Sequence, residues 1–299
     1  MSQKLSLQKQ IVDGADAGPR LLITGGVHGD EFESMAAIRR LFTAIRPTEL
    51  RGSVVLVPVV NEAAFLRGSR VADDGLDLAR TLPGRIDGSI TERIALAVNE
   101  LIGSSDYYID LHSGGSTMCV LPFAGYTLHP DPNVLDAQRR MAKAFNLPLV
   151  WGTTPTLQGR TLSAARDFRV PAIYAEYLGC GQCSQQGVSD YFEGCMNVMA
   201  ELGMIDRAAP ASRVERVIED PRPDSGHLQV CNPAPMTGFF EPVVELGQQI
   251  CVGELIGQIT DPLGRTTREI RSQQSGMVIL LTTFSRVLEG NSLAVILEL

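Results

Sequence analysis

Short apolar runs alternate with segments of helical periodicity along the first two thirds of the chain. Residues 53–60 read SVVLVPVV, a nearly continuous β-branched run that predicts a strand covered on both faces. Residues 31–45 carry apolar side chains at helical spacing with arginines between them, which predicts a helix. The same patterns predict an edge strand and turn in 1–20, strands at 21–24, 106–112, 118–123, 148–151 and 171–178, and helices at 89–102, 133–145, 162–169 and 188–202. This alternation predicts an α/β fold with a mixed sheet flanked by helices.

The pattern changes after residue 205. Residues 206–226 are dense in proline and charge, which predicts a linker. From 227 to 299, short β-rich runs are separated by glycines and no helical period remains. We therefore expect a catalytic α/β domain over 1–205 and a small all-β domain over 227–299.

The stretch GGVHGDE at residues 25–31 holds two candidate metal ligands. His28 and Glu31 are three residues apart where a strand becomes a helix, so both side chains can face one point. On its own such a pair is equally compatible with a surface helix start. A hydrolytic zinc keeps three protein ligands and one open position, so a further ligand is needed.

Two other histidines lie in the α/β part, His112 and His129. His112 ends a predicted strand and precedes a Gly-rich turn, where side chains of an open sheet reach a crevice. His129 lies between residues typical of a turn. We predict His112 as the third ligand, with Asp110 on the same strand face either as its hydrogen-bond partner or as a structural carboxylate.

Metal-assisted hydrolysis also needs a general base that is not a ligand. Glu176 is the single charge in the apolar strand 171–178, which makes it the candidate base. A strand residue facing solvent is the alternative reading of the same pattern.

The long, weakly periodic segment 61–88 is rich in arginine. Connections of this length in a compact domain are usually functional or disordered. Arginine grips carboxylates with two parallel hydrogen bonds. Arg70 is therefore a candidate for polarising a scissile carbonyl and Arg80 for holding a substrate carboxylate, although loop charges are more often simply solvated.

Composition narrows the classes of function. Hydrophobic residues make up 44% and charged residues 20% of 299 positions, which is ordinary for a globular enzyme. The net charge of -8 gives no basic footprint for nucleic acid or an anionic membrane. No apolar run reaches membrane-spanning length, and the N-terminal residues are polar, so no secretory signal is expected. The six cysteines lack framework spacing, so we expect a cytoplasmic location. For the Cys180/Cys183 pair we favour ordinary thiols over the alternative of a redox role.

Taken together, four motifs resemble the succinylglutamate desuccinylase/aspartoacylase family, a branch of the zinc carboxypeptidase-like superfamily. They are GGVHGDE at 25–31, the loop ending DLARTLPG at 77–84, DLHSG at 110–114 and AEYLG at 175–179. The resemblance covers essentially the whole chain. It implies one zinc ion per chain held by His28, Glu31 and His112, with Glu176 as general base, Arg70 supporting the carbonyl oxygen and Arg80 binding a substrate carboxylate.

The chain departs from the family pattern at two positions. Ala79 stands where the family has Asn in an Asp-Leu-Asn-Arg motif, and Glu62 stands where Pro often follows Asn. Loss of the Asn removes one hydrogen-bond partner for the carboxylate, so the substrate is expected to differ from N-acetylaspartate or succinylglutamate. Arg67 and Arg160 are candidates to compensate.

The C-terminal part resembles the β domain of bacterial members, which is similar to a biotinyl/lipoyl-type barrel-sandwich. Biotin and lipoate are attached to a lysine amine, and residues 227–299 contain no lysine. We therefore expect a structural or site-covering module and no carrier function.

These observations predict a zinc-dependent amidohydrolase that removes the acyl group from an N-acyl amino acid or a similar small anionic compound. The alternatives are a metallo-carboxypeptidase acting on peptides and a non-catalytic metabolite-binding member of the family. The expected partner is a small-molecule substrate, without nucleic acid or membrane, and a homo-oligomer is compatible with the sequence.

Overall fold

The apolar runs form the strands of a large mixed sheet. The computed structural model describes residues 5–223, 225–228 and 231–298, so the first four residues of the predicted segment 1–20 lie outside the described residues. In the described part the sheet has eleven strands. They are β1 (Gln10–Asp13), β2 (Asp16–Gly25), β3 (Arg51–Val57), β4 (Tyr107–Leu111), β5 (Met118–Thr127), β6 (Leu149–Thr153), β7 (Ala172–Gly179), β8 (Arg216–Glu219), β10 (Gln249–Ile250), β13 (Gly276–Thr282) and β15 (Ala294–Leu297).

The centre of this sheet is parallel. Strands β3, β2, β4 and β7 lie side by side in this order and run in one direction, with β1 antiparallel at the edge. Strand β5 is antiparallel to β7; its last residues pair with β6 and its first residues pair with β13. The predicted mixed sheet is thus confirmed.

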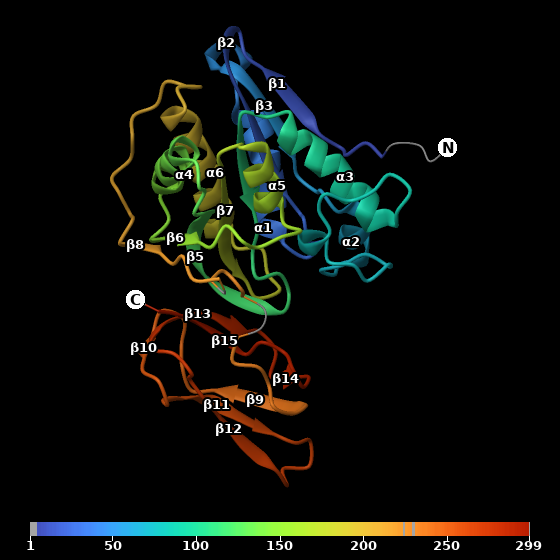
Figure 1. Cartoon of the computed structure of the whole chain (residues 1–299), viewed down its shortest axis with the longest axis vertical. Helices are drawn as coiled ribbons and strands as arrows, with labels where there is room; N and C mark the ends of the chain where they lie inside the picture. Colours follow the sequence, from blue (N-terminus) through green and yellow to red (C-terminus); the bar gives the residue numbers. More distant parts are fainter. Residues whose placement is uncertain (1–4, 224, 229–230, 299) are drawn as a thin grey trace.

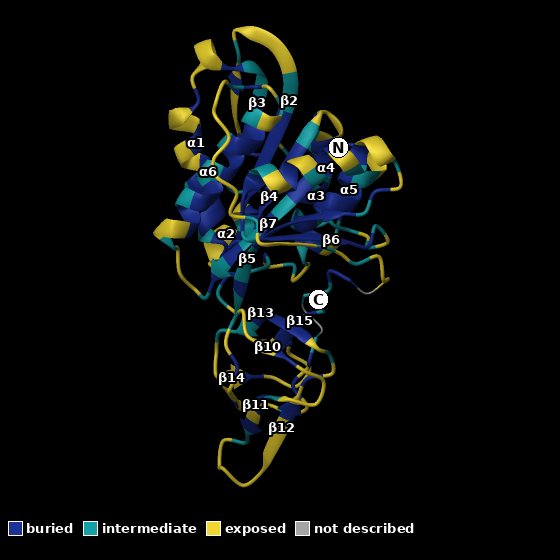
Figure 2. Cartoon of the chain, turned by 90° about the vertical axis from the view of Figure 1, so that its left-hand side faces the viewer, coloured by how far each residue is buried: buried dark blue, intermediate teal, exposed yellow. Residues whose placement is uncertain are grey.

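Helices cover both faces of the sheet (Figure 1). Helices α1 (Phe32–Ala44), α4 (Pro132–Phe145) and α6 (Gln185–Glu201) pack on one face, and α3 (Ile90–Gly103) and α5 (Thr161–Phe168) pack on the other. Helix α3, predicted at 89–102, begins with a capping box formed by Ser89 and Glu92. Buried residues follow the sheet and the inner faces of the helices, while exposed residues lie on their outer faces (Figure 2).

The long segment 61–88 has more structure than its weak periodicity indicates. It contains helix α2 (Glu62–Arg67) and the 3₁₀ helix η2 (Leu78–Arg80). The Asn61 side chain caps α2 by accepting from the Ala64 N–H, and Gly68 ends it at φ 62°. Asp74 accepts hydrogen bonds from the N–H and hydroxyl of Thr91, which anchors the loop to α3. The segment is therefore ordered by caps rather than by an apolar stripe.

Residues 206–226, predicted as a linker, include strand β8 (Arg216–Glu219). This strand pairs in parallel with β6, and Glu219 at its end binds Arg139 of α4 and the hydroxyl of Tyr126. The density of proline and charge thus marked the end of the helix–strand alternation, but the segment is attached to the sheet and is not a free linker.

The C-terminal part is all-β, as expected. A separate four-stranded sheet contains β9 (Gly238–Pro242), β11 (Leu255–Thr260), β12 (Thr267–Arg271) and β14 (Arg286–Val287). Strand β13 joins the two parts, since Val278 packs into the β-domain core whereas Met277 and Ile279 pack with Phe123 and Trp151. The two parts therefore share an apolar layer at β13 and are not separated by a gap. The domain boundaries 1–205 and 227–299 stay a prediction.

The prediction that Cys180 and Cys183 are both ordinary thiols is wrong for Cys180. Cys180 forms a disulfide with Cys119, and Cys183 is a free, exposed thiol. The partners are 61 residues apart in the sequence and are brought together by the pairing of β5 with β7. Spacing along the chain contains no sign of that pairing.

Candidate active site

Three segments meet at the carboxyl ends of the central parallel strands. His28 and Glu31 follow β2, His112 follows β4, and Glu176 lies near the end of β7. Carboxyl ends of parallel strands open onto one crevice. All four residues line the same cavity, which has a volume of about 400 Å³.

The predicted ligands converge on one point. Ligand atoms of His28, Glu31 and His112 all lie within 4.8 Å of one another. The Nδ1 atom of His28 lies 2.6 Å from one oxygen of Glu31, and the Nδ1 atom of His112 lies 3.0 Å from the other. One carboxylate thus stands between two imidazoles, and all three are buried.

Each imidazole is held from behind by a second carboxylate. His28 Nε2 donates to Asp77 Oδ1 at 3.1 Å, and His112 Nε2 donates to Asp110 Oδ2 at 2.9 Å. Such partners fix the ring orientation and, in the neutral imidazole, leave the lone pair on Nδ1 available to a metal. Asp110 accepts further hydrogen bonds from the hydroxyls of Thr24 and Thr161, so it is the hydrogen-bonded partner that the sequence suggested.

The arrangement suits a divalent cation. Burial alone would raise the pKa of Glu31, but the neighbouring imidazoles outweigh it and hold the pKa below its ordinary value. Burial also acts to lower the pKa of His112, and the charges of Asp110 and Glu31 reverse this and raise it. Glu31 is thus held as a carboxylate, and two imidazoles with one carboxylate form a donor set that zinc uses at hydrolytic sites.

Glu176 lies apart from the cluster in a different environment. Burial raises the pKa of its carboxyl group to about 8, with the Glu31 charge acting in the same direction and His112 acting against it. Perturbed carboxyl groups in a cleft are candidates for proton transfer. Its position in the cavity fits the role of general base predicted from the sequence.

Three arginines form a positive wall of the cavity. Arg70 donates to Asp77 through Nε at 3.2 Å and Nη2 at 3.0 Å, and its Nη1 lies 4.0 Å from Glu31. Arg160 donates to the Gly226 carbonyl, and burial together with the charge of Arg80 lowers its pKa to about 10. Burial also lowers the pKa of Arg80. A substrate anion placed here would relieve the repulsion between these guanidinium groups.

Arg67 is not part of this wall. It is exposed on the surface, where it pairs with Asp73, and it does not line the cavity. The reason is that α2 turns its last residue toward solvent before the chain returns to the cavity at Arg70. Of the two arginines proposed to compensate for Ala79, only Arg160 faces the cavity.

The β domain closes the outer side of the cavity. Leu280 and Thr282 of β13, together with Asn291 and Ser292, are part of the cavity lining. These side chains are neutral, so the charge of the cavity comes from the α/β part. Within the described residues, the acidic groups lining the cavity are Glu31 and Glu176.

Two residues of the site were assigned no role by the sequence analysis. Asp77 lies behind the cavity lining and connects the candidate ligand His28 to Arg70; it opens the DLARTLPG motif, but the motif alone does not show these contacts. Tyr174 lines the cavity, and burial and the Glu176 charge raise the pKa of its phenol. The period of two along a strand could have found Tyr174, because it lies two residues before Glu176 on the same face.

The α/β part of the chain matches a known protein family. Residues 17–202 match the succinylglutamate desuccinylase/aspartoacylase catalytic domain. This chain belongs to that family. The resemblance found in its motifs is thereby confirmed.

Individual relatives extend the match beyond the catalytic domain. The chain is 30% identical over 289 residues to an N-alpha-acetyl-L-2,4-diaminobutyric acid deacetylase of Halomonas elongata, covering 94% of this chain and 82% of the relative. A succinylglutamate desuccinylase/aspartoacylase of Rhodobacter sphaeroides has a similar structure, with a TM-score of 0.87, 27% identity and coverage of 97% and 88%. The product-bound structure of an ectoine utilization protein of Ruegeria pomeroyi is also similar, with a TM-score of 0.85 and 28% identity. The match covers 96% of this chain and 87% of that protein.

Proposed function

We propose that this protein is a zinc-dependent hydrolase that cleaves the amide bond of an N-acyl amino acid or a similar small anionic N-acyl compound. The single observation that carries the proposal is the position of Glu176 in one cavity with the His28–Glu31–His112 cluster and the arginine wall. Membership of a deacylase family and the named activity of the Halomonas relative support the same reaction class.

His28 and His112 through Nδ1, with Glu31, are proposed to hold one zinc ion per chain. When bound, zinc supplies positive charge that polarises the amide carbonyl and acidifies water. Glu176 takes the proton from the attacking water and returns it to the leaving nitrogen. Arg70, oriented by Asp77, stabilises negative charge as it develops on the carbonyl oxygen.

Substrate selection is assigned to the arginine wall. Arg80 and Arg160 are proposed to bind a carboxylate of the substrate, while Ala79 leaves space where the family motif has an amide. The neutral wall from the β domain closes the cavity toward the outside, which favours small substrates over polypeptides. This favours deacylation over carboxypeptidase activity.

The proposal is tested by measuring hydrolysis of N-acetyl, N-succinyl and N-formyl amino acids, including N-alpha-acetyl-2,4-diaminobutyrate, with zinc-loaded protein. Release of the free amine from at least one of them is expected. Trimming of peptides from the carboxyl end without release from N-acyl amino acids would favour the carboxypeptidase reading. Binding without any turnover would favour the non-catalytic reading.

Arg80→Ala is expected to weaken substrate binding more than it slows chemistry. On the best substrate of the panel, KM should rise about 10–100-fold, because a charge-assisted pair with the carboxylate is lost. Steady-state kinetics measures this. Arg67→Ala in the same loop is the matched control, and equal effects of the two variants would contradict the assignment.

Asp77→Asn should reduce kcat/KM by about 10–100-fold, the usual effect of removing a carboxylate behind a ligating histidine. The variant loses the charge that orients both Arg70 and His28. Kinetics and zinc affinity, measured by competition with a chromophoric chelator, should change together. Asp73→Asn, which removes a surface carboxylate of the same loop, should change neither.

The remaining assignments concern the cellular setting. No helix in the part of the chain that the structure describes is long and apolar enough to cross a membrane. We propose a cytoplasmic location, since four of the six cysteines are free thiols. Zinc and a small anionic substrate are the proposed partners. A homo-oligomer is compatible with the sequence.

A further inference from the structure

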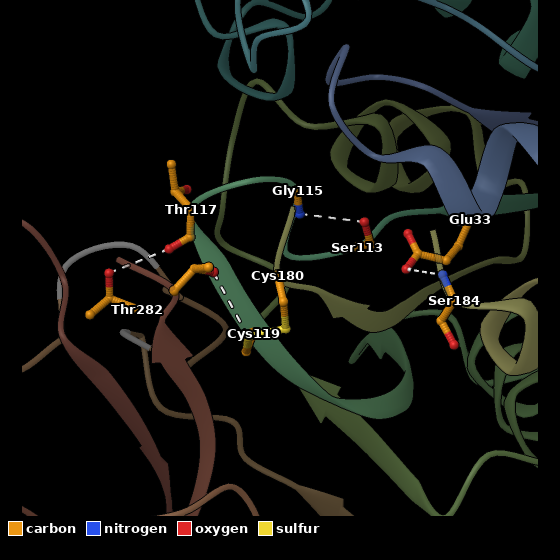
Figure 3. The surroundings of a disulfide bond; sticks show 9 residues. Glu33, Ser113, Gly115, Thr117, Cys119, Cys180, Ser184 and Thr282 are labelled. Carbon is orange, nitrogen blue, oxygen red and sulfur yellow. Dashed lines mark hydrogen bonds between the residues drawn. A yellow bond between two sulfur atoms is a disulfide. The ribbon is translucent and has the colours of Figure 1, made fainter. Parts of the chain in front are cut away.

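A disulfide lies where the loop after His112 meets the end of β7 (Figure 3). Cys119 stands between Met118 and Val120, which both line the cavity. Its partner, Cys180, follows Glu176 by four residues. The disulfide therefore joins the segment that carries a candidate ligand to the strand that carries the candidate base.

The backbones of these two segments are in direct contact. Gly114 N–H donates to the Leu178 carbonyl at 3.2 Å, Cys180 N–H donates to Met118 at 2.9 Å, and Gly181 N–H donates to Gly115 at 2.8 Å. A Cβ atom added to Gly179 would lie 2.6 Å from the Gly114 nitrogen. The loop cannot shift at this point without moving the end of β7.

The end of β7 adopts an unfavourable backbone conformation. Leu178 has a φ of 34° and Cys180 a φ of 54°, both in the left-handed region. For residues other than glycine this region of the backbone map is unfavourable, because the Cβ atom crowds the backbone. The segment keeps this conformation because the three hydrogen bonds and the disulfide hold it.

The same loop is tied to two further parts of the site. The N–H and hydroxyl of Ser116 donate to Asp30, which lies between His28 and Glu31, at 2.9 and 2.7 Å. The Thr117 carbonyl accepts from Thr283 N–H of the β domain at 2.8 Å. The loop 113–117 thus connects the ligand segments, the base strand and the β-domain wall.

The disulfide is within reach of solvent thiols. Both of its cysteines are half-buried, and the exposed Cys183 follows three residues after Cys180. Burial and the Glu33 charge raise the pKa of the Cys183 thiol, so little of it is thiolate at neutral pH.

We propose that Cys119–Cys180 is a redox-modification site, a reducible staple that reacts with dithiol reductants and whose opening lowers catalytic turnover. Reduction removes the covalent tie between Cys119, which follows the loop 113–117, and the end of β7. The His112 N–H still donates to the Ala175 carbonyl, so reduction loosens the cavity-lining loop and the chain that follows Glu176. Arg80 and Arg160 lie on other segments and keep their positions. Disulfides in cytoplasmic proteins are usually of this transient, redox-responsive kind.

The reaction is an ordinary thiol–disulfide exchange. A thiolate of the dithiol attacks one sulfur, forms a mixed disulfide and releases the other cysteine, which takes up a proton. The second thiol of the reductant then displaces the bound cysteine. Two electrons and two protons pass to Cys119 and Cys180, and the reductant becomes a disulfide.

The test compares oxidised and dithiothreitol-reduced full-length protein, both loaded with zinc. Thiol titration after denaturation should give four free thiols before reduction and six after it. Peptide mapping should identify the Cys119–Cys180 pair. Zinc content is measured in both samples, because dithiols also bind zinc.

Reduction should lower kcat about tenfold and leave KM within about twofold, since small misplacements of reacting groups act mainly on the chemical step. Amide hydrogen exchange should become faster in residues 113–118 and 177–181. Cys119→Ser should match the reduced wild type and should no longer respond to dithiothreitol. Cys183→Ser and Cys251→Ser, which leave the disulfide intact, should keep full activity when oxidised and the full response.

Six free thiols in oxidised protein would overturn the proposal, as would unchanged kcat and hydrogen exchange after reduction at equal zinc content. The activity readout rests on the proposed hydrolytic function. If neither form hydrolyses any N-acyl substrate, that function fails, whereas thiol titration and hydrogen exchange still decide whether the staple exists and opens.

Discussion

Glu176→Gln is expected to lower kcat by about 10³-fold, within the range that general acid–base groups contribute. The amide keeps the shape of the side chain but can neither accept the proton of water nor return it to the leaving nitrogen. KM should change little, because the residues proposed to bind the substrate are untouched. Steady-state kinetics on the best N-acyl substrate measures both constants.

Zinc content provides the control for this variant. Glu176 is not among the three clustered ligand residues, so Glu176→Gln should bind one zinc per chain as wild type does. A variant with full zinc and full turnover would exclude Glu176 as the base. Loss of zinc together with activity would instead place Glu176 among the ligands.

The same substitution should stabilise the metal-free protein. Burial raises the pKa of Glu176 from 4.5 to about 8, so between these values the unfolded chain releases a proton that the folded chain retains. Stability linked to this group is therefore lost as pH rises from about 4.5 toward 8. The melting temperature of Glu176→Gln should exceed that of wild type by about 2–4 °C at neutral pH, with a smaller difference near pH 5. Thermal unfolding of both metal-free proteins across this range measures the difference.

Removal of the metal should also cause a large loss of turnover. Extraction with a chelator or the substitution His112→Ala should abolish turnover to below about 10⁻³ of wild type, because the charge that polarises the carbonyl is removed. Removing one of three protein ligands should also weaken zinc binding strongly. Elemental analysis and kinetics are measured on the same samples.

Added zinc should restore the chelated wild type but leave His112→Ala inactive at stoichiometric metal. His129→Ala is the matched control, because His129 lies in a turn where its Nδ1 accepts from the Asp131 N–H. It should keep both zinc and activity. Full activity in metal-free wild type would reject the zinc proposal.

Local patterns in the sequence were sufficient for much of the architecture. The apolar run at β3 and the capping box at Ser89 depend on neighbouring residues, so their elements could be predicted. Strand β8 and helix α2 were missed for the opposite reason. The first is stabilised by pairing with β6, and the second by the Asn61 cap.

The candidate site likewise contains residues that the sequence identified and residues that only the structure placed. His28, Glu31, His112 and Glu176 lie in motifs at strand ends, and the order of these motifs resembles a known family, so the sequence alone pointed to them. Arg67 and Arg70 look alike in the sequence, and only the path of the loop after α2 sends one to solvent and the other to the cavity. Asp77 became visible as a partner of both His28 and Arg70 once distances were known.

The sequence by itself thus determined the fold class and identified the candidate ligand residues and the candidate base. These follow from residue identity and short-range spacing. The tertiary structure decided which arginines face the cavity, which residues of the β domain line it, and that Cys180 forms a disulfide with Cys119. Those features depend on which strands become neighbours, and contacts across 61 residues of chain are fixed by packing of the whole sheet.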